Sequence, residues 1–69
     1  MVEVFKTDIK KRSQSKTLVK KLQQHYPESC INFDLEDCDN ILRVEGEDIC
    51  PHTIIQLLIS DGYCCQLLQ

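Results

Sequence analysis

The segment from residue 30 to residue 45 constrains the fold most, because its apolar residues alternate with polar ones on both sides of a turn. A period of two is typical of a strand with one buried face, which predicts strands over residues 30–36 and 41–45. Residues 37–40, Asp-Cys-Asp-Asn, have the composition of a turn between them. The apolar face of the first strand consists of Ile31, Phe33 and Leu35.

The position of the turn sets the expected register of this hairpin. With the turn at residues 37–40, Asp34 lies opposite Arg43, which makes an oppositely charged pair on the polar face. On the apolar face the expected pairs are Leu35 with Leu42 and Phe33 with Val44. This register satisfies both faces of the hairpin at once.

A first helix is expected from Ser13, a candidate N-cap, to Tyr26, because Pro27 ends it. A second helix is expected from Cys50-Pro51, with proline at the favoured first helical position, to Asp61-Gly62, where glycine adopts the left-handed conformation. Both segments carry apolar residues at helical spacing. These residues are Leu18, Val19, Leu22 and Tyr26 in the first helix, and Ile54, Ile55 and Leu58 in the second.

Two further strands, over residues 2–7 and 63–68, complete the order β-α-β-β-α-β. Right-handed crossovers then predict an α+β fold, a ferredoxin-like sandwich whose four-stranded antiparallel sheet, in the order 4-1-3-2, carries two helices on one face. A chain of this length is expected to form a single domain, residues 1–69. The first strand leaves two choices for its buried face, Val2 with Val4 or Phe5 with Thr7.

Charge is unevenly distributed along the chain. Residues 1–27 hold seven of the eight basic residues and two acidic ones, a net charge of +5. Residues 28–69 hold Arg43 and nine acidic residues, a net charge of −8. Such polarity can steer a partner or orient self-association, and it is equally what two separately solvated faces produce.

The five cysteines do not predict a disulfide or zinc framework, since their number is odd and Cys-x-x-Cys is absent. Most are expected to behave as small, buried or half-buried apolar residues. In the final strand, Cys65 is expected in the core and Cys64 on the exposed side. Cys50 is the candidate for redox chemistry, because a helix N-terminus favours the thiolate, although Glu47 and Asp48 oppose that effect.

The apolar and glycine residues of the second half follow a recognisable pattern. This pattern consists of Val44-Glu-Gly46, Pro51, Ile54-Ile55, Leu58 and Gly62-Tyr63. Together with Leu18 and Leu22 of the first helix, it resembles the heavy-metal-associated domain family, small βαββαβ carriers of copper and related soft ions. The resemblance covers nearly all 69 residues, and it implies the fold given above.

The resemblance also implies where a metal would bind. That family holds its ion with a Cys-x-x-Cys pair between the first strand and the first helix, because two thiolates suit a soft ion such as Cu(I). Here the corresponding positions are Lys11 and Gln14, preceded by Ile9 as the apolar residue of the motif. Neither side chain supplies a thiolate, and Lys10-Lys11-Arg12 makes the segment basic. No metal ligand is therefore carried over from the family.

A non-standard metal site is the alternative. The predicted hairpin register places Cys30 opposite Glu47, close to Cys50 and His52, and His25 ends the first helix at the same end. Thiolate and imidazole groups are the ligands that zinc and copper prefer. The same four residues are better explained as separate surface side chains that share one end of the fold, and redox chemistry of Cys50 is the third possibility.

Enzymatic activity is not expected, because the chain lacks a glycine-rich phosphate loop and the pair of Cys50 with His52 lacks a third, orienting group. An acidic open sheet face argues against nucleic acid as a partner. The apolar runs are shorter than a membrane span and the first residues lack the layout of a signal peptide, so we expect a cytoplasmic protein with reduced thiols.

These observations predict a small non-enzymatic binding or adaptor protein. Its expected partner is an unidentified protein or a second copy of the chain, joined through an exposed edge of the strand over residues 30–36 or 63–68. The alternative function is a copper or zinc carrier or sensor that uses Cys30, Cys50 and His52.

Overall fold

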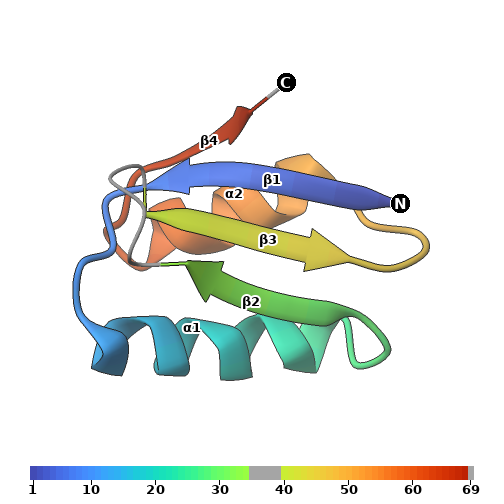
Figure 1. Ribbon diagram of the computed structural model, residues 1–69, viewed down its shortest axis with the longest axis horizontal. Coiled ribbons are helices and arrows are strands. Elements are labelled where there is room, and N and C mark those ends of the chain that lie inside the picture. Colours follow the sequence, from blue (N-terminus) through green and yellow to red (C-terminus); the bar gives the residue numbers. More distant parts are fainter. Residues whose placement is uncertain (35–39, 69) are drawn as a thin grey trace.

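The computed structural model describes residues 1–34 and 40–68, which form two helices and four strands in the order β-α-β-β-α-β (Figure 1). The predicted α+β class is confirmed. In chain order the elements are β1 (Val2–Thr7), α1 (Arg12–His25), β2 (Cys30–Asp34), β3 (Ile41–Glu45), α2 (Pro51–Ser60) and β4 (Cys65–Leu68).

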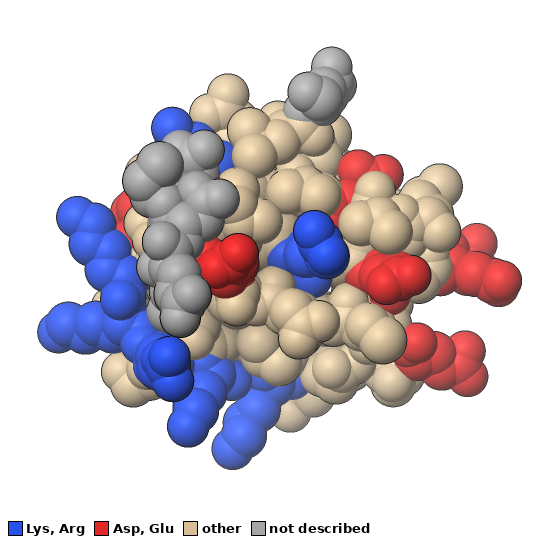
Figure 2. All heavy atoms as spheres, viewed as in Figure 1, with Lys and Arg blue, Asp and Glu red and all other residues tan. Residues whose placement is uncertain are grey.

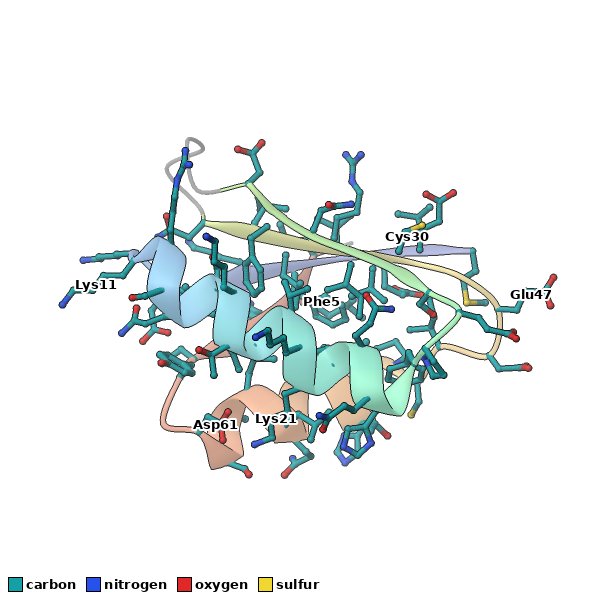
Figure 3. All side chains as sticks on the ribbon, turned by 90° about the horizontal axis from the view of Figure 1, so that it is seen from below. Phe5, Lys11, Lys21, Cys30, Glu47 and Asp61 are labelled. Atoms are coloured by element: carbon teal, nitrogen blue, oxygen red, sulfur yellow. The ribbon has the colours of Figure 1, made fainter. Side chains whose placement is uncertain are left out.

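The four strands form one antiparallel sheet in the order β2-β3-β1-β4, as predicted. Both helices lie on the same face of this sheet, and its other face is open (Figure 3). β2 and β4 are the two edges. α1 runs alongside β2, whereas α2 lies behind the middle of the sheet (Figure 1).

The hairpin of β2 and β3 forms, but its predicted register is wrong by two residues. Phe33 lies opposite Leu42 rather than Val44, and Asp34 does not lie directly opposite Arg43. A shift of two residues keeps every side chain on its predicted face, so the hydrophobic pattern cannot distinguish the two registers. The observed pairs are Cys30 with Glu45, Ile31 with Val44, Asn32 with Arg43, Phe33 with Leu42 and Asp34 with Ile41. The predicted pairing of Leu35 and most of the predicted turn, residues 37–39, lie outside the described residues.

β1 buries Phe5 and Thr7 rather than Val2 and Val4. Phe5 is fully buried, whereas Val2 is 49% exposed. The hydroxyl of Thr7 donates a hydrogen bond to the Asn40 carbonyl at 2.7 Å and accepts one from the Ile9 backbone N–H at 3.3 Å. Burying Thr7 therefore leaves no unsatisfied polar group, which removes the main penalty for placing it inside.

The core fills the space between the sheet and the two helices. Every element except β4 contributes at least one fully or nearly buried apolar side chain, as do the two segments that precede the helices. These side chains are Phe5, Ile9, Leu18, Leu22, Ile31, Leu42, Val44, Ile49, Ile54 and Leu58.

α1 begins earlier than predicted. Its N-cap is Lys11, not Ser13, and the backbone N–H of Ser15 donates to the Lys11 carbonyl at 3.1 Å. The Lys11 side chain makes no capping hydrogen bond. Because Ile9 is fully buried, its packing fixes the chain just before the helix, and this outweighs the local preference for serine at the cap.

α2 has the predicted ends. Cys50 is its N-cap and Pro51 its first residue. At its other end Gly62 has a φ of +88°, its N–H donates to the Ile59 carbonyl at 2.9 Å, and the Tyr63 N–H donates to the Leu58 carbonyl at 3.0 Å. This is the Schellman arrangement of a helix C-terminus.

β4 is shorter than the predicted strand, which was expected to begin at residue 63. The Tyr63 N–H is used to close α2, and the Cys64 N–H donates to the Asp8 carboxylate at 2.9 Å. Pairing with β1 therefore starts only at Cys65, opposite Thr7.

Candidate functional site

The segment between β1 and α1 forms one end of the molecule. Ile9 is buried beneath it, and the side chains of Lys10, Lys11 and Arg12 are exposed. We call these three exposed residues the basic tip. Gln14, in the first turn of α1, is half-buried. Lys11 and Gln14, the positions that correspond to the cysteine pair of the heavy-metal-associated family, thus present an ammonium and an amide group. The ammonium repels a soft cation, and the amide binds it only weakly.

The four candidate metal ligands do not form a common site. Cys30 lies opposite Glu45, not Glu47, and its side chain is exposed on the open face of the sheet, together with those of Asn32 and Asp34. Cys50 and His52 are exposed at the start of α2, and His25 is exposed at the end of α1. Among residues 1–34 and 40–68, no group of three or more His, Cys, Asp or Glu side chains is placed to hold a metal ion.

The α1–β2 and β3–α2 connections do meet at one end, as predicted. They enclose a shallow hollow of about 310 Å³. Its lining includes three carboxylates and one imidazole, those of Glu28, Glu47, Asp48 and His25. It is therefore an acidic surface, and the predicted thiols are not part of it. We call this end the acidic end.

The basic tip and the acidic end lie at opposite ends of the molecule. In Figure 3, Lys11 and Glu47 mark the two ends. Figure 2 shows basic side chains gathered at one end and along α1, and acidic side chains gathered at the other. The uneven charge of the sequence thus becomes a partial separation of charge in space, the kind of field that orients an approaching partner. Of the described acidic residues after position 27, Asp34 at the end of β2 and Asp61 at the end of α2 lie toward the basic tip.

The thiols of Cys50 and Cys65 have different environments. The Thr53 side chain, followed by the Thr53 and His52 backbone N–H groups, lowers the pKa of the exposed Cys50 thiol, because these groups stabilise the thiolate at the start of α2. Burial raises the pKa of Cys65 to about 11. Cys64 is exposed and Cys65 is half-buried against the core, as predicted for this pair. The expectation that most cysteines are buried or half-buried is wrong for the described ones, because all of them except Cys65 are exposed.

A groove with a volume of about 450 Å³ lies between α1 and the edge of β2. Apolar side chains form its floor, and two lysines of α1 stand along it. Its lining consists of Ser15, Lys16, Val19, Lys20, Ile31, Asn32 and Phe33. Sequence reasoning missed this groove. The available signal was the position of two lysines on the same side of the helix as Val19, next to a strand placed at the sheet edge.

Comparisons of this chain with protein-family models, with curated proteins and with solved structures found no match. Neither of the two helices in the described part of the chain combines the length and apolar character needed to cross a membrane.

Proposed function

We propose that this chain is a small non-enzymatic binding or adaptor protein with a ferredoxin-like fold of the heavy-metal-associated type. In this proposal the basic tip replaces the cysteine pair of that family, and the partner is a protein rather than a metal ion. The strand order β2-β3-β1-β4, with both helices on one face, supports the ferredoxin-like assignment.

The separation of charge between the basic tip and the acidic end is the observation that carries the function. A compact surface with opposite charges at its two ends attracts a charged partner and fixes its orientation before contact. The basic residues of α1 extend the positive region along one side of the molecule (Figure 2), so the favoured partner carries acidic residues.

Selection from an unbiased library tests this function. The full chain is immobilised and random heptapeptides are selected on it, with reducing agent and a metal chelator present. We expect enrichment of acidic peptides whose affinity falls as salt rises, because salt screens exposed charges. A failure to enrich any peptide, or enrichment that requires added metal, would contradict the proposal.

The alternative function, a copper or zinc carrier using Cys30, Cys50 and His52, gains no support from the geometry. Cys30 belongs to the open face of the sheet, whereas the other two residues belong to the start of α2.

A further inference from the structure

The edge of β2 presents backbone groups that no neighbouring strand covers. Gly46 N–H donates to the Met1 carbonyl at 3.0 Å, so these two residues form a hydrogen-bonded pair between β1 and β3. Hydrogen-bonded pairs alternate along an antiparallel ladder, so the peptide groups of Arg43 and Glu45 face β2. In β2 the residues bonded to them are Asn32 and Cys30, respectively.

It follows that the peptide groups of Ile31 and Phe33 point away from β3, out of the sheet. The next outward group along the chain, the Ser29 carbonyl, is already occupied, since Gln23 Nε2 donates to it at 2.7 Å. Gln23 also donates to the Tyr26 carbonyl at 3.0 Å. Among the described residues, the open edge of β2 thus offers the peptide groups of two residues, and α1 lies alongside it (Figure 1).

The groove continues this open edge on the helix side of the sheet. The side chain of Ile31 is buried, and those of Phe33 and Val19 are half-buried, so an apolar surface is left partly exposed. Lys16 and Lys20 are exposed and line the same groove. Lys21 faces α2 instead, where its Nζ lies 2.6 Å from Asp61 Oδ1.

We propose that the edge of β2 and the adjacent groove bind an extended acidic peptide segment of a partner protein, which adds a fifth, antiparallel strand to the sheet. This inference rests on the proposed binding function and names its surface and its partner. Peptide residues directly opposite Ile31 and Phe33 point toward α1, because opposite residues share a face. We expect one of these two peptide residues to be apolar and to pack on Val19. The other, two positions away in the peptide, is Asp or Glu and forms an ion pair with Lys16 or Lys20.

A second copy of this chain is a less favourable occupant of the same edge. A two-fold dimer through β2 places α1 of each copy beside α1 of the other, because both helices lie on the same face of the extended sheet. Lys16 and Lys20 of the two copies then approach each other, and this repulsion disfavours the dimer. An acidic strand removes the repulsion, so charge selects the partner.

A designed peptide tests the proposal. The probe is Thr-Glu-Thr-Val-Thr-Glu-Thr, acetylated and amidated, in which alternate residues supply one apolar and two acidic side chains to one face. It is titrated into the full chain at low salt and followed through the backbone amide signals by NMR. We expect the largest shifts at Ile31 and Phe33, with smaller ones along α1 at Lys16, Val19 and Lys20.

Two matched pairs of variants separate the contributions to binding. The groove variant carries both Lys16→Glu and Lys20→Glu. It is compared with a tip variant that carries both Lys10→Glu and Lys11→Glu, which changes the net charge by the same amount but lies outside the groove. We expect the groove variant to weaken binding about tenfold or more, since it removes two favourable cross-strand charge pairs and replaces them with repulsion. We expect the tip variant to weaken it several-fold less.

In the peptide, N-methylation of the central valine removes a hydrogen bond to β2, whereas N-methylation of the preceding threonine alters an amide that points away from it. We expect the first change to abolish binding and the second to retain most of it. Equal effects of the two methylations would overturn the added-strand geometry.

The outcomes distinguish this inference from the proposed function. If the acidic peptide binds but the shifts gather at the basic tip, the groove assignment is wrong and the binding function stands. If neither this peptide nor any selected peptide binds, the proposed function itself fails. If the Ile31 and Phe33 signals shift with protein concentration alone, a second copy occupies this edge and the proposal is overturned.

Discussion

Gly46 shows how one residue holds two segments of the chain together. A Cβ at this position would lie 2.5 Å from Ser29 Oγ and 3.1 Å from Ser29 Cβ. Only a residue without a side chain allows the end of β3 to pass the α1–β2 connection so closely. The same Ser29 offers its carbonyl to Gln23, so the fit at Gly46 also positions the start of the open edge of β2.

We predict that Gly46→Ala lowers the free energy of unfolding by about 1–3 kcal/mol, the usual effect of overpacking. In a Ser29→Ala background the same substitution should cost less, because the nearest atom, Ser29 Oγ, is gone. Urea denaturation of the four proteins measures both losses. Equal losses in the two backgrounds would show that contact with the Ser29 hydroxyl is not the cause.

The lowered pKa of Cys50 leads to a second prediction at this scale. Near neutral pH, iodoacetamide should modify Cys50 faster than Cys65, because the thiolate is the reacting form. Thr53→Val removes the hydroxyl that contributes most to the lowering and keeps the side-chain shape, so it should slow modification of Cys50. Peptide mass mapping over time measures each rate, and an unchanged Cys50 rate in the variant would contradict this explanation.

At the scale of elements, periodicity predicted the helices, the strands and the faces of the hairpin. The register of β2 against β3 was not predicted, because a shift of two residues preserves both faces. The start of α1 and the buried face of β1 depend on tertiary contacts of Ile9 and Phe5, which local propensity does not encode. The shortening of β4 likewise follows from Asp8, which is 56 positions away from Cys64 in the chain.

Cys65, the first residue of β4 to pair with β1, leads to a prediction for how the free energy of unfolding depends on pH. Its pKa is raised from 9.0 to about 11 by burial, so the folded state keeps the proton where the unfolded state releases it. Stability from this group is therefore complete below about pH 9 and is lost as the pH rises toward 11. In Cys65→Ala the free energy of unfolding should fall less steeply between these pH values.

Cys64→Ala is the matched control, because its side chain is exposed on the neighbouring position. Urea denaturation at a series of pH values compares the two variants with the parent chain. A Cys65→Ala curve parallel to that of the parent would show that burial of this thiol does not couple folding to pH.

At the scale of the whole molecule, the sequence showed that charge is uneven along the chain, but it predicted neither where the charged residues lie in space nor the groove. Segment totals are enough to reveal a basic and an acidic half. The groove depends instead on which strand is placed beside α1 and on which side chains the two elements leave partly uncovered, and no sequence period reports that. The predicted metal ligands lie toward the same end of the fold but on different surfaces. Cys30 is on the open face of the sheet, whereas Cys50 and His52 are at the start of α2.

We therefore expect the reduced chain to retain neither Cu(I) nor Zn(II) when titrated against a competing chelator. Metal content after desalting measures this. Retention of about one equivalent that is lost in Cys50→Ser but kept in Cys64→Ser would contradict the expectation and favour a metal carrier.

The hydrogen bonds from Gln23 to the Tyr26 and Ser29 carbonyls have a consequence for how long any complex at β2 persists. They end the open edge of β2 on the side of Ser29, and the described part of that edge offers two residues for pairing. For the strand proposed to bind there, we therefore expect side-chain contacts in the groove to contribute much of the affinity. Because few backbone hydrogen bonds must break when such a strand dissociates, we expect a high dissociation rate. We therefore expect the proposed site to exchange its peptide partners rapidly and not to form one permanent assembly.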